Sequence, residues 1–313
     1  MALQTTGSVG LSAEMKTFYD RLLLERTVPV LLYANFGQKR TIPAGTGKII
    51  EFRRFSGLAV ATTPLTEGAL YTNLKDLTVT AITATPVQYG DAVGFSDVVS
   101  TVAFDPLLTE TTEILGEQAG ETIDEIVRDI VVAGTTVLYA STAVSRVTVG
   151  AAMIFSPAEI RRAVLQLKLN RAKKINGFYH AVIHPRTTHD LISSQEWRDA
   201  QVYGQTGRVF DGSLGTLYGV KFWESDKATV YVNGGVTATV DVFATMIFGA
   251  NAYGVVGLSG HNLRTIYKPL GSAGTADPLD QQQTQGWKVM FTAKILNDAF
   301  MVRFEHSTST AAN

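Results

Sequence analysis

The sequence feature that most constrains the fold is a long amphipathic stretch, residues 105–133. Its apolar residues recur every three or four positions, as on one face of a helix: Leu107, Leu108, Ile114, Leu115, Ala119, Ile123, Ile126, Val127, Ile130 and Val131. Acidic residues follow the same spacing on the opposite face: Glu110, Glu113, Glu117, Glu121 and Asp124. Asp105 and Pro106 are suited to begin such a helix and Gly134 to end it. At about 1.5 Å per residue the helix would be roughly 40 Å long. The sequence therefore predicts a single long helix with a buried apolar face and an exposed acidic face.

Composition excludes several classes of protein. Hydrophobic residues make up 45% and charged residues 18% of the 313 residues, enough to build a large core with two or three subdomains. The net charge of -1 argues against a strongly basic nucleic-acid-binding surface. The absence of cysteine excludes disulfides and thiolate metal sites. Residues 1–15 lack the apolar centre of a secretion signal, and no run of 18 apolar residues predicts a membrane span.

The first 95 residues predict extensions rather than a core. A short amphipathic helix before Pro29 cannot bury its apolar stripe alone, so it must dock on its own domain or on a neighbour. Residues 48–55 and 78–87 are rich in β-branched and aromatic residues and predict the two strands of a hairpin. Residues 56–71, which join them, are too many for a tight turn. Two interpretations stay open for this loop: an arm that reaches another subunit, or a disordered surface loop.

The remaining chain predicts a second subdomain of mixed helices and strands. Ser156 and Pro157 begin a helix that is followed by a strand at residues 179–183, and a further helix begins at Thr187 or Thr188. Strands are also expected at residues 220–223, 230–232, 246–256, 287–293 and 299–305, the last two as a hairpin that turns near Asn297. One helix face is basic and is either solvated or in contact with phosphate or an acidic partner: Arg161, Arg162, Lys168, Arg171, Lys173 and Lys174.

Candidate chemical motifs are few. Residues 45–48 (GTGK) resemble the end of a phosphate-binding loop, but Lys48 is followed by a strand-like run rather than by Ser or Thr and a helix. His180, His184 and His189 lie on a strand, a Pro turn and a helix, which does not direct three rings to one metal. We therefore predict no catalytic, cofactor-binding or metal-binding residue, and a protein that is not an enzyme.

The order of the segments resembles the major capsid proteins of tailed bacteriophages, most nearly those of N4-like phages. The resemblance covers nearly the whole chain and rests on several segments in sequence order: FYDRLLLER, KIIEFRRF, LTVTAITATPVQYGDAVGFSD, HAVIHPRTTHDL and GWKVMFTAKILNDAFMVRFE. It implies an α+β fold of the Hong Kong 97 type. The implied organisation is an N-terminal arm (1–47), an extended β-hairpin loop (48–90), a peripheral domain built on the spine helix (91–150 and 286–313) and an axial domain (151–285).

The resemblance also implies a function. Copies of the chain would self-assemble into hexamers and pentamers of an icosahedral head shell around double-stranded DNA, with no cofactor and no membrane. The location would be the virion capsid, with assembly in the cytoplasm of the host bacterium. Scaffolding, portal and decoration proteins would be further partners. Lys48, Lys75 and Asn297 could in principle form the covalent crosslinks of some relatives, but no residue pattern supports this.

Contacts between subunits are expected where the arm and the loop meet the acidic face of the spine helix. The candidate residues are Lys39, Arg40, Arg53, Arg54, Pro64, Leu65, Glu67, Glu113, Glu117 and Glu121. We hypothesise that basic groups of the arm and the loop pair with the acids as a network, because single exposed ion pairs contribute little. Two alternatives stay open: an encapsulin-like shell without a viral role, and an α+β ligand-binding domain or enzyme.

Overall fold

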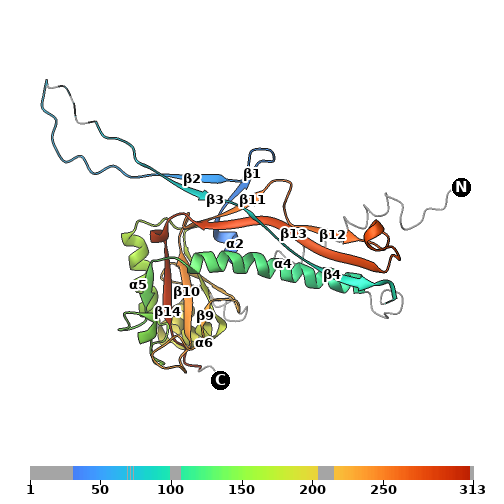
Figure 1. The fold of residues 1–313 in the computed structure, drawn as a ribbon. Helices are drawn as coiled ribbons and strands as arrows, with labels where there is room; N and C mark the ends of the chain where they lie inside the picture. The colour runs from blue at the N-terminus through green and yellow to red at the C-terminus, as the bar shows by residue number, and fades with distance from the viewer. Residues whose placement is uncertain are drawn as a thin grey trace.

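The fold is organised on the predicted spine helix, α4 (Leu107–Val132), in a computed structural model that describes residues 31–68, 70, 72, 74–98, 107–203 and 215–310 (Figure 1). The predicted stripe is buried at five positions: Leu115, Ala119, Ile123, Val127 and Val131. The predicted start at Asp105 and Pro106 lies outside the described residues. At the other end, a Cβ on Gly134 would lie 2.4 Å from Cε of Met301 and 2.7 Å from Oδ1 of Asp298, so any other residue there would require these side chains to shift.

A five-stranded sheet lies along α4. Its longest strand, β13 (Gln282–Ile295), pairs with β4 (Val87–Ser96) on one side and with β11 (Tyr253–Leu258) and β12 (Arg264–Lys268) on the other, and β1 (Gln38–Ile42) adds to β11 in parallel. Alternate residues of β13 are buried, and the Trp287 indole N–H donates to Gln118 Oε1 of α4 at 3.1 Å. The alternating strand pattern therefore reflects a sheet with one face on the helix, as Figure 1 shows.

A second, seven-stranded sheet forms the other half of the molecule. Its order is β5 (Val137–Tyr139), β14 (Met301–His306), β10 (Val242–Phe248), β6 (Tyr179–Ile183), β8 (Val220–Glu224) and β7 (Thr216–Leu217), with β9 (Val230–Tyr231) paired to the start of β10. The central strands β6 and β10 are buried along their whole length, which requires cover on both faces. The helices of this half are α5 (Pro157–Leu169), α6 (Pro185–Ser193) and α7 (Gln195–Tyr203), with short 3-10 turns at Arg146–Thr148, Gly274–Ala276 and Asp298–Phe300 elsewhere in the chain.

Three local predictions are wrong. The expected single strand over residues 246–256 is two strands, β10 and β11, because the chain leaves one sheet at Gly249 and enters the other at Tyr253. The expected hairpin of residues 287–293 with 299–305 does not form, because β13 and β14 lie in different sheets on either side of a 3-10 turn. The helix predicted to begin at Thr187 or Thr188 begins at Pro185, capped by the His184 ring, which accepts from the backbone N–H of Arg186.

Strand pairing also differs from the predicted grouping of segments. Strands β11 and β12, within the expected axial range 151–285, pair with the sheet on α4. Strand β14, within the expected peripheral range 286–313, pairs with β10 and β5. The assignment of peripheral and axial domains stays a prediction, with these strands crossing between its two halves.

The burial of side chains along α4 differs at two positions from the predicted pattern of one apolar buried face and one acidic exposed face. Ile114, predicted to be buried, is 62% exposed, and Asp124, predicted to be exposed, is 5% exposed. Asp124 faces α2 (Tyr33–Phe36), the first helix of the described chain, which packs on α4. The sheet and α2 thus cover different sides of the helix, which a single stripe does not describe.

Candidate subunit interface

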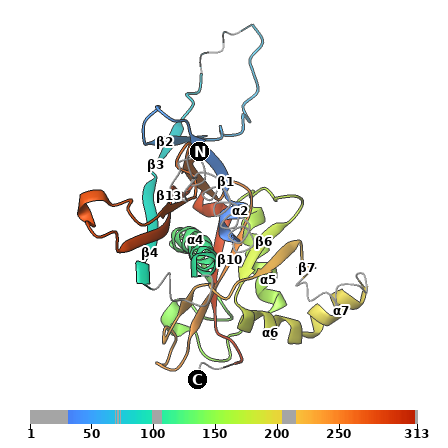
Figure 2. The same cartoon turned by 90° about the vertical axis from the view of Figure 1, so that its right-hand side faces the viewer.

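The extended loop exposes an unusual number of large apolar side chains to solvent. Strands β2 (Ile50–Phe55) and β3 (Val79–Ala84) pair as an antiparallel hairpin whose loop projects far from the body in both views (Figures 1 and 2). Six large apolar residues of the loop are between 59% and 89% exposed: Leu58, Val60, Leu65, Leu70, Leu74 and Leu77. Such a concentration of exposed apolar side chains is typical of a surface that is covered by another protein.

The root of the hairpin, in contrast, is anchored to the body. Ile50 and Phe52 pack on a small core of Ile42, Ala84 and Val256. A Cβ on Gly254 would lie 2.9 Å from the Phe52 ring, so this glycine allows the hairpin to approach β11 closely. The hairpin therefore leaves the body in a fixed direction while its apolar loop has no core to join.

A groove of about 710 Å³ lies beside the hairpin root. Its lining includes the aromatic rings of Phe52, Phe55 and Phe300 together with basic residues of β1 and β2, namely Arg40, Arg53 and Arg54. The Arg53 guanidinium pairs with Glu51 at 2.7 Å, and its side chain is 68% exposed. Three arginines against one glutamate leave this groove basic, a surface suited to an acidic and partly apolar partner.

The family of the chain follows from its sequence. The profile of the family described as phage capsid protein matches residues 79–304, well over half of the chain. The chain belongs to this family. It is a structural protein of a phage capsid, located in the virion capsid, and it assembles with other copies into a multimeric shell.

Solved capsid structures have a similar fold. The capsid of Ralstonia phage GP4 matches this capsid protein with a TM-score of 0.70 and 14% identity, over 89% of this chain and 88% of that chain. The capsid of cyanophage P-SCSP1u matches with a TM-score of 0.68 and 16% identity, over 89% of each chain. The virus-like particle from Pyrococcus furiosus matches with a TM-score of 0.51 and 12% identity, over 93% of this chain and 99% of that chain. A search of curated proteins found no match. The predicted Hong Kong 97-like α+β fold is confirmed, and the nearer likeness to N4-like phages stays a prediction.

The predicted contact residues of the capsid protein fall into two groups. Those of the hairpin, the loop and β1 are exposed: Lys39, Arg40, Arg53, Arg54, Pro64, Leu65 and Glu67. Of the acids on α4, Glu117 is exposed, Glu113 is half-buried, and Glu121 pairs with Lys227 at 3.4 Å. The Lys39 ammonium donates to Asn35 Oδ1 at 3.1 Å. Arg53 and Glu121 thus have ion-pair partners within their own subunit, and whether the two groups meet between subunits stays a prediction.

The three histidines are dispersed, as their spacing indicates. His180 stacks on Phe36 with ring centroids 4.5 Å apart, His184 caps α6, and the exposed His189 lies beside Asp190 with a distance of 3.5 Å from Nδ1 to Oδ1. In the part of the chain that the structure describes, no cluster of His, Asp and Glu could hold a metal ion, and no helix is long and apolar enough to span a membrane.

Two arginines on the basic face of α5 have acidic partners within the subunit, and Arg171, Lys173 and Lys174 lie beyond the end of the helix. Arg161 pairs with Glu196 at 3.1 Å and Arg162 pairs with Glu159 at 2.6 Å. The Arg162 guanidinium also donates to the Tyr139 carbonyl at 3.1 Å. These contacts favour the interpretation of a solvated helix face for this part of α5.

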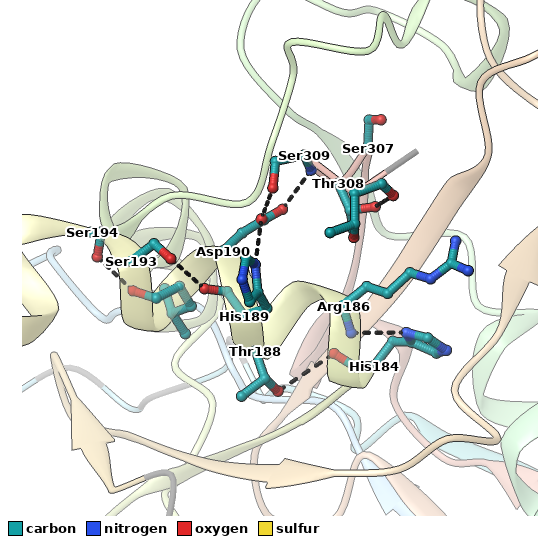
Figure 3. Close-up of polar contacts among 12 residues, drawn as sticks. His184, Arg186, Thr188, His189, Asp190, Ser193, Ser194, Ser307, Thr308 and Ser309 are labelled. Atoms are coloured by element: carbon teal, nitrogen blue, oxygen red, sulfur yellow. Dashed lines mark hydrogen bonds and ion pairs between the residues drawn. The ribbon is translucent and has the colours of Figure 1, made fainter. Parts of the chain in front are cut away.

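Sequence reasoning missed a carboxylate that fixes the C-terminal segment. Asp190 on α6 is buried, and its two oxygens accept from the backbone N–H of Ser309 at 2.8 Å and from the Ser309 hydroxyl (Figure 3). Ser307 and Thr308 are buried beside it. A buried aspartate in the middle of a helix signals a polar partner from elsewhere, but the sequence does not say that the partner lies 119 residues away.

Proposed function

We propose that the chain forms hexamers and pentamers that close an icosahedral head shell around phage double-stranded DNA, and that the extended loop joins neighbouring subunits. The observation that carries this proposal is the projecting hairpin with its exposed leucines and valines. Apolar surface of this kind is removed from water only by another molecule, and the chain belongs to a family of capsid proteins.

The geometry favours a ring of subunits. A loop that docks on a different part of the neighbouring chain makes a head-to-tail contact, and such contacts can repeat around a closed ring. The net charge of -1 suits a shell that encloses DNA without binding its phosphates strongly. Scaffolding, portal and decoration proteins are the further partners that such a shell implies, and assembly would take place in the host cytoplasm.

A second candidate is an encapsulin-like shell without a viral role. The virus-like particle from Pyrococcus furiosus has a similar fold, with a TM-score of 0.51 against 0.70 for the capsid of Ralstonia phage GP4, so the head shell is the better supported of the two. The contents of purified particles distinguish the two functions: phage DNA supports the head shell, whereas an enclosed enzyme without phage DNA supports the alternative.

Shortening the loop tests the proposed role of the hairpin. Residues 56–78, which join Phe55 of β2 to Val79 of β3, would be replaced by a two-residue Asn-Gly turn, which suits an antiparallel hairpin. A surface loop without contacts to other subunits would tolerate this change, because closing a shorter loop costs less conformational entropy. We expect the variant to keep the circular dichroism spectrum and thermal unfolding of the dissociated subunit, yet to form no closed shells in electron micrographs or sedimentation.

The two contrary outcomes have different meanings. Normal shells from the shortened variant would contradict the intersubunit role of the loop. Loss of folding would instead place the hairpin in the subunit core.

A further inference from the structure

The segment that leads from the N-terminal arm into the body is α2, a single helical turn. Leu32 occupies its N-cap position and provides no side-chain cap. Instead, Oδ1 of Asp124 on α4 accepts a hydrogen bond from the backbone N–H of Ala34 at 3.2 Å. The first N–H groups of a helix require such an acceptor, usually a side chain beside them in sequence. Here the acceptor comes from 90 residues away, so Asp124 attaches the root of the arm to the spine helix.

Two further contacts hold α2 against the sheets. The Tyr253 hydroxyl donates to the Tyr33 carbonyl at 2.6 Å, and Phe36 stacks on the His180 ring. Burial raises the pKa of both tyrosines, so the phenols stay neutral, and burial lowers the pKa of His180, so its ring is neutral at pH 7. The contact through Asp124 therefore differs from these two in changing charge near neutral pH.

The surroundings of Asp124 are rich in acids. A cavity of about 320 Å³ beside it is also lined by Glu121 and Glu125 of α4, by Glu224 at the end of β8 and by Asp226 just after it. Asp124 thus shares this cavity with four other acidic side chains.

The nearby cations already have acidic partners. Lys227, which also lines the cavity, pairs with Glu121 at 3.4 Å. The Arg128 guanidinium pairs with Asp129 at 2.8 Å and with Glu125 at 3.3 Å, and it donates to the Lys227 carbonyl at 2.7 Å. Among the residues that the structure describes, no ion pair compensates Asp124 itself.

We propose that Asp124 and the acidic cavity beside it form a proton-dependent latch, which holds α2 on α4 when Asp124 is protonated and loosens when Asp124 is charged. Burial is the main cause that raises the pKa of Asp124 to about 6, against the opposing hydrogen bonds from the α2 backbone and the charge of Arg128. When Asp124 is released into water, its carboxyl has the ordinary pKa of about 3.8. At pH values between 3.8 and 6, closing the latch is therefore accompanied by the binding of a proton to Asp124. The latch is strongest at acidic pH and weakens as the pH rises through about 6.

Hydrogen exchange of the full chain tests the latch. The exchange rate of a peptide covering residues 31–37 would be followed by mass spectrometry from pH 5 to pH 8 and divided by the intrinsic chemical rate at each pH. Linkage between pKa values of about 6 and 3.8 predicts that protection of this peptide falls about tenfold from pH 5 to pH 8. Asp124→Asn keeps a hydrogen-bond acceptor without a charge, so its protection should stay high and vary less than about twofold.

A matched control uses the next aspartate of the same helix. Asp129 has a side chain that is 68% exposed, and Asp129→Asn should keep the tenfold change of the wild type. Wild-type protection that does not vary with pH would overturn the proposal, and so would the same variation in Asp124→Asn. The latch belongs to the single subunit, so this measurement does not depend on shell formation; only an effect of the latch on contacts between copies rests on the proposed function.

Discussion

At the scale of single residues, one buried carboxylate joins three parts of the molecule. Glu305 on β14 is fully buried, and its oxygens accept from Arg146 at 2.9 and 2.7 Å in a two-pronged contact. It also pairs with Arg303 at 2.8 Å, whose guanidinium donates to the carbonyls of Val132 and Gly134 at the end of α4. The spine helix, β14 and the turn at Arg146 are therefore connected through a single charge.

Removal of this carboxylate should be strongly destabilising. Glu305→Ala leaves two arginines beside a buried void, and breaking a buried ion pair costs roughly 3–5 kcal/mol. Urea unfolding of dissociated subunits at pH 7 measures the loss. The control is Glu196→Ala, which removes an exposed partner of Arg161 and should cost less than about 1 kcal/mol. Similar midpoints for the two variants would show that the buried pair contributes no more than the exposed one.

His306 makes the stability of the same sheet depend on pH. Its Nδ1–H donates to the Ser307 carbonyl at 2.8 Å, and its Nε2 lies 2.9 Å from the Thr245 hydroxyl, which can donate to the neutral ring. Burial lowers the pKa of His306 to about 4 from an ordinary 6.5. The unfolded chain then binds more protons in this interval, and folding stability falls as the pH falls from 6.5 toward 4.

The expected loss between pH 8 and pH 5 is about 2 kcal/mol. His306→Gln has no group that titrates in this interval, so the difference in unfolding free energy between wild type and variant should shrink by this amount as the pH falls. A difference that stays constant from pH 8 to pH 5 would show that the ring does not titrate as its burial indicates.

At the scale of elements, the strongest periodic patterns predicted the structure best. The spine helix and both strands of the hairpin form where the sequence places them, because the helix has a long apolar stripe with helical spacing and the strands are rich in β-branched and aromatic residues. Asp124 was placed on the wrong side because α4 packs on α2 as well as on the sheet, and α2 comes from a segment far away in sequence. The partners of β13 and β14 were missed because alternation marks a strand but does not identify its neighbour.

Two substitutions on α4 distinguish the observed face from the simple stripe. Ile123→Asp places a charge at a position that is 7% exposed and should cost several kcal/mol, giving insoluble or unfolded protein. Ile114→Asp introduces the same charge at a position that is 62% exposed, and the subunit should stay folded within about 0.5 kcal/mol. Soluble expression and thermal unfolding compare them; soluble, folded Ile123→Asp protein would show that this face of the helix is not a core.

At the scale of the whole molecule, the subunit consists of two sheets joined by the spine helix, with the hairpin extending beyond both (Figure 1). The sequence indicated the candidate interface through the length of the loop, and it left a disordered surface loop open as the alternative. It could not indicate the groove at the hairpin root, because Phe300 and Arg40 line the same groove from distant parts of the chain.

Charge reversal in this groove should weaken assembly without unfolding the subunit. Arg53→Glu together with Arg54→Glu converts a basic rim into an acidic one, so acidic groups of a neighbouring copy would be repelled. We expect lower particle yield and a stronger dependence of yield on salt, measured by sedimentation. The control is Lys173→Glu with Lys174→Glu, an equal charge change at exposed positions of the other half. Unchanged yield across salt concentrations in the arginine variant would remove these residues from the interface.

The long strand β13 has a consequence for how the subunit is made. It is the shared partner of β4, β11 and β12, and β14 similarly joins β5 to β10, so neither sheet is complete before residues 282–306 have been synthesised. Strands that wait for distant partners fold slowly and leave their edges open to other chains. We therefore expect a growing or truncated chain to lack the body on which the hairpin root is fixed. In this topology, both sheets are complete only in a chain that has been synthesised through β14. We therefore expect only such a chain to present its loop to a neighbour from an ordered root.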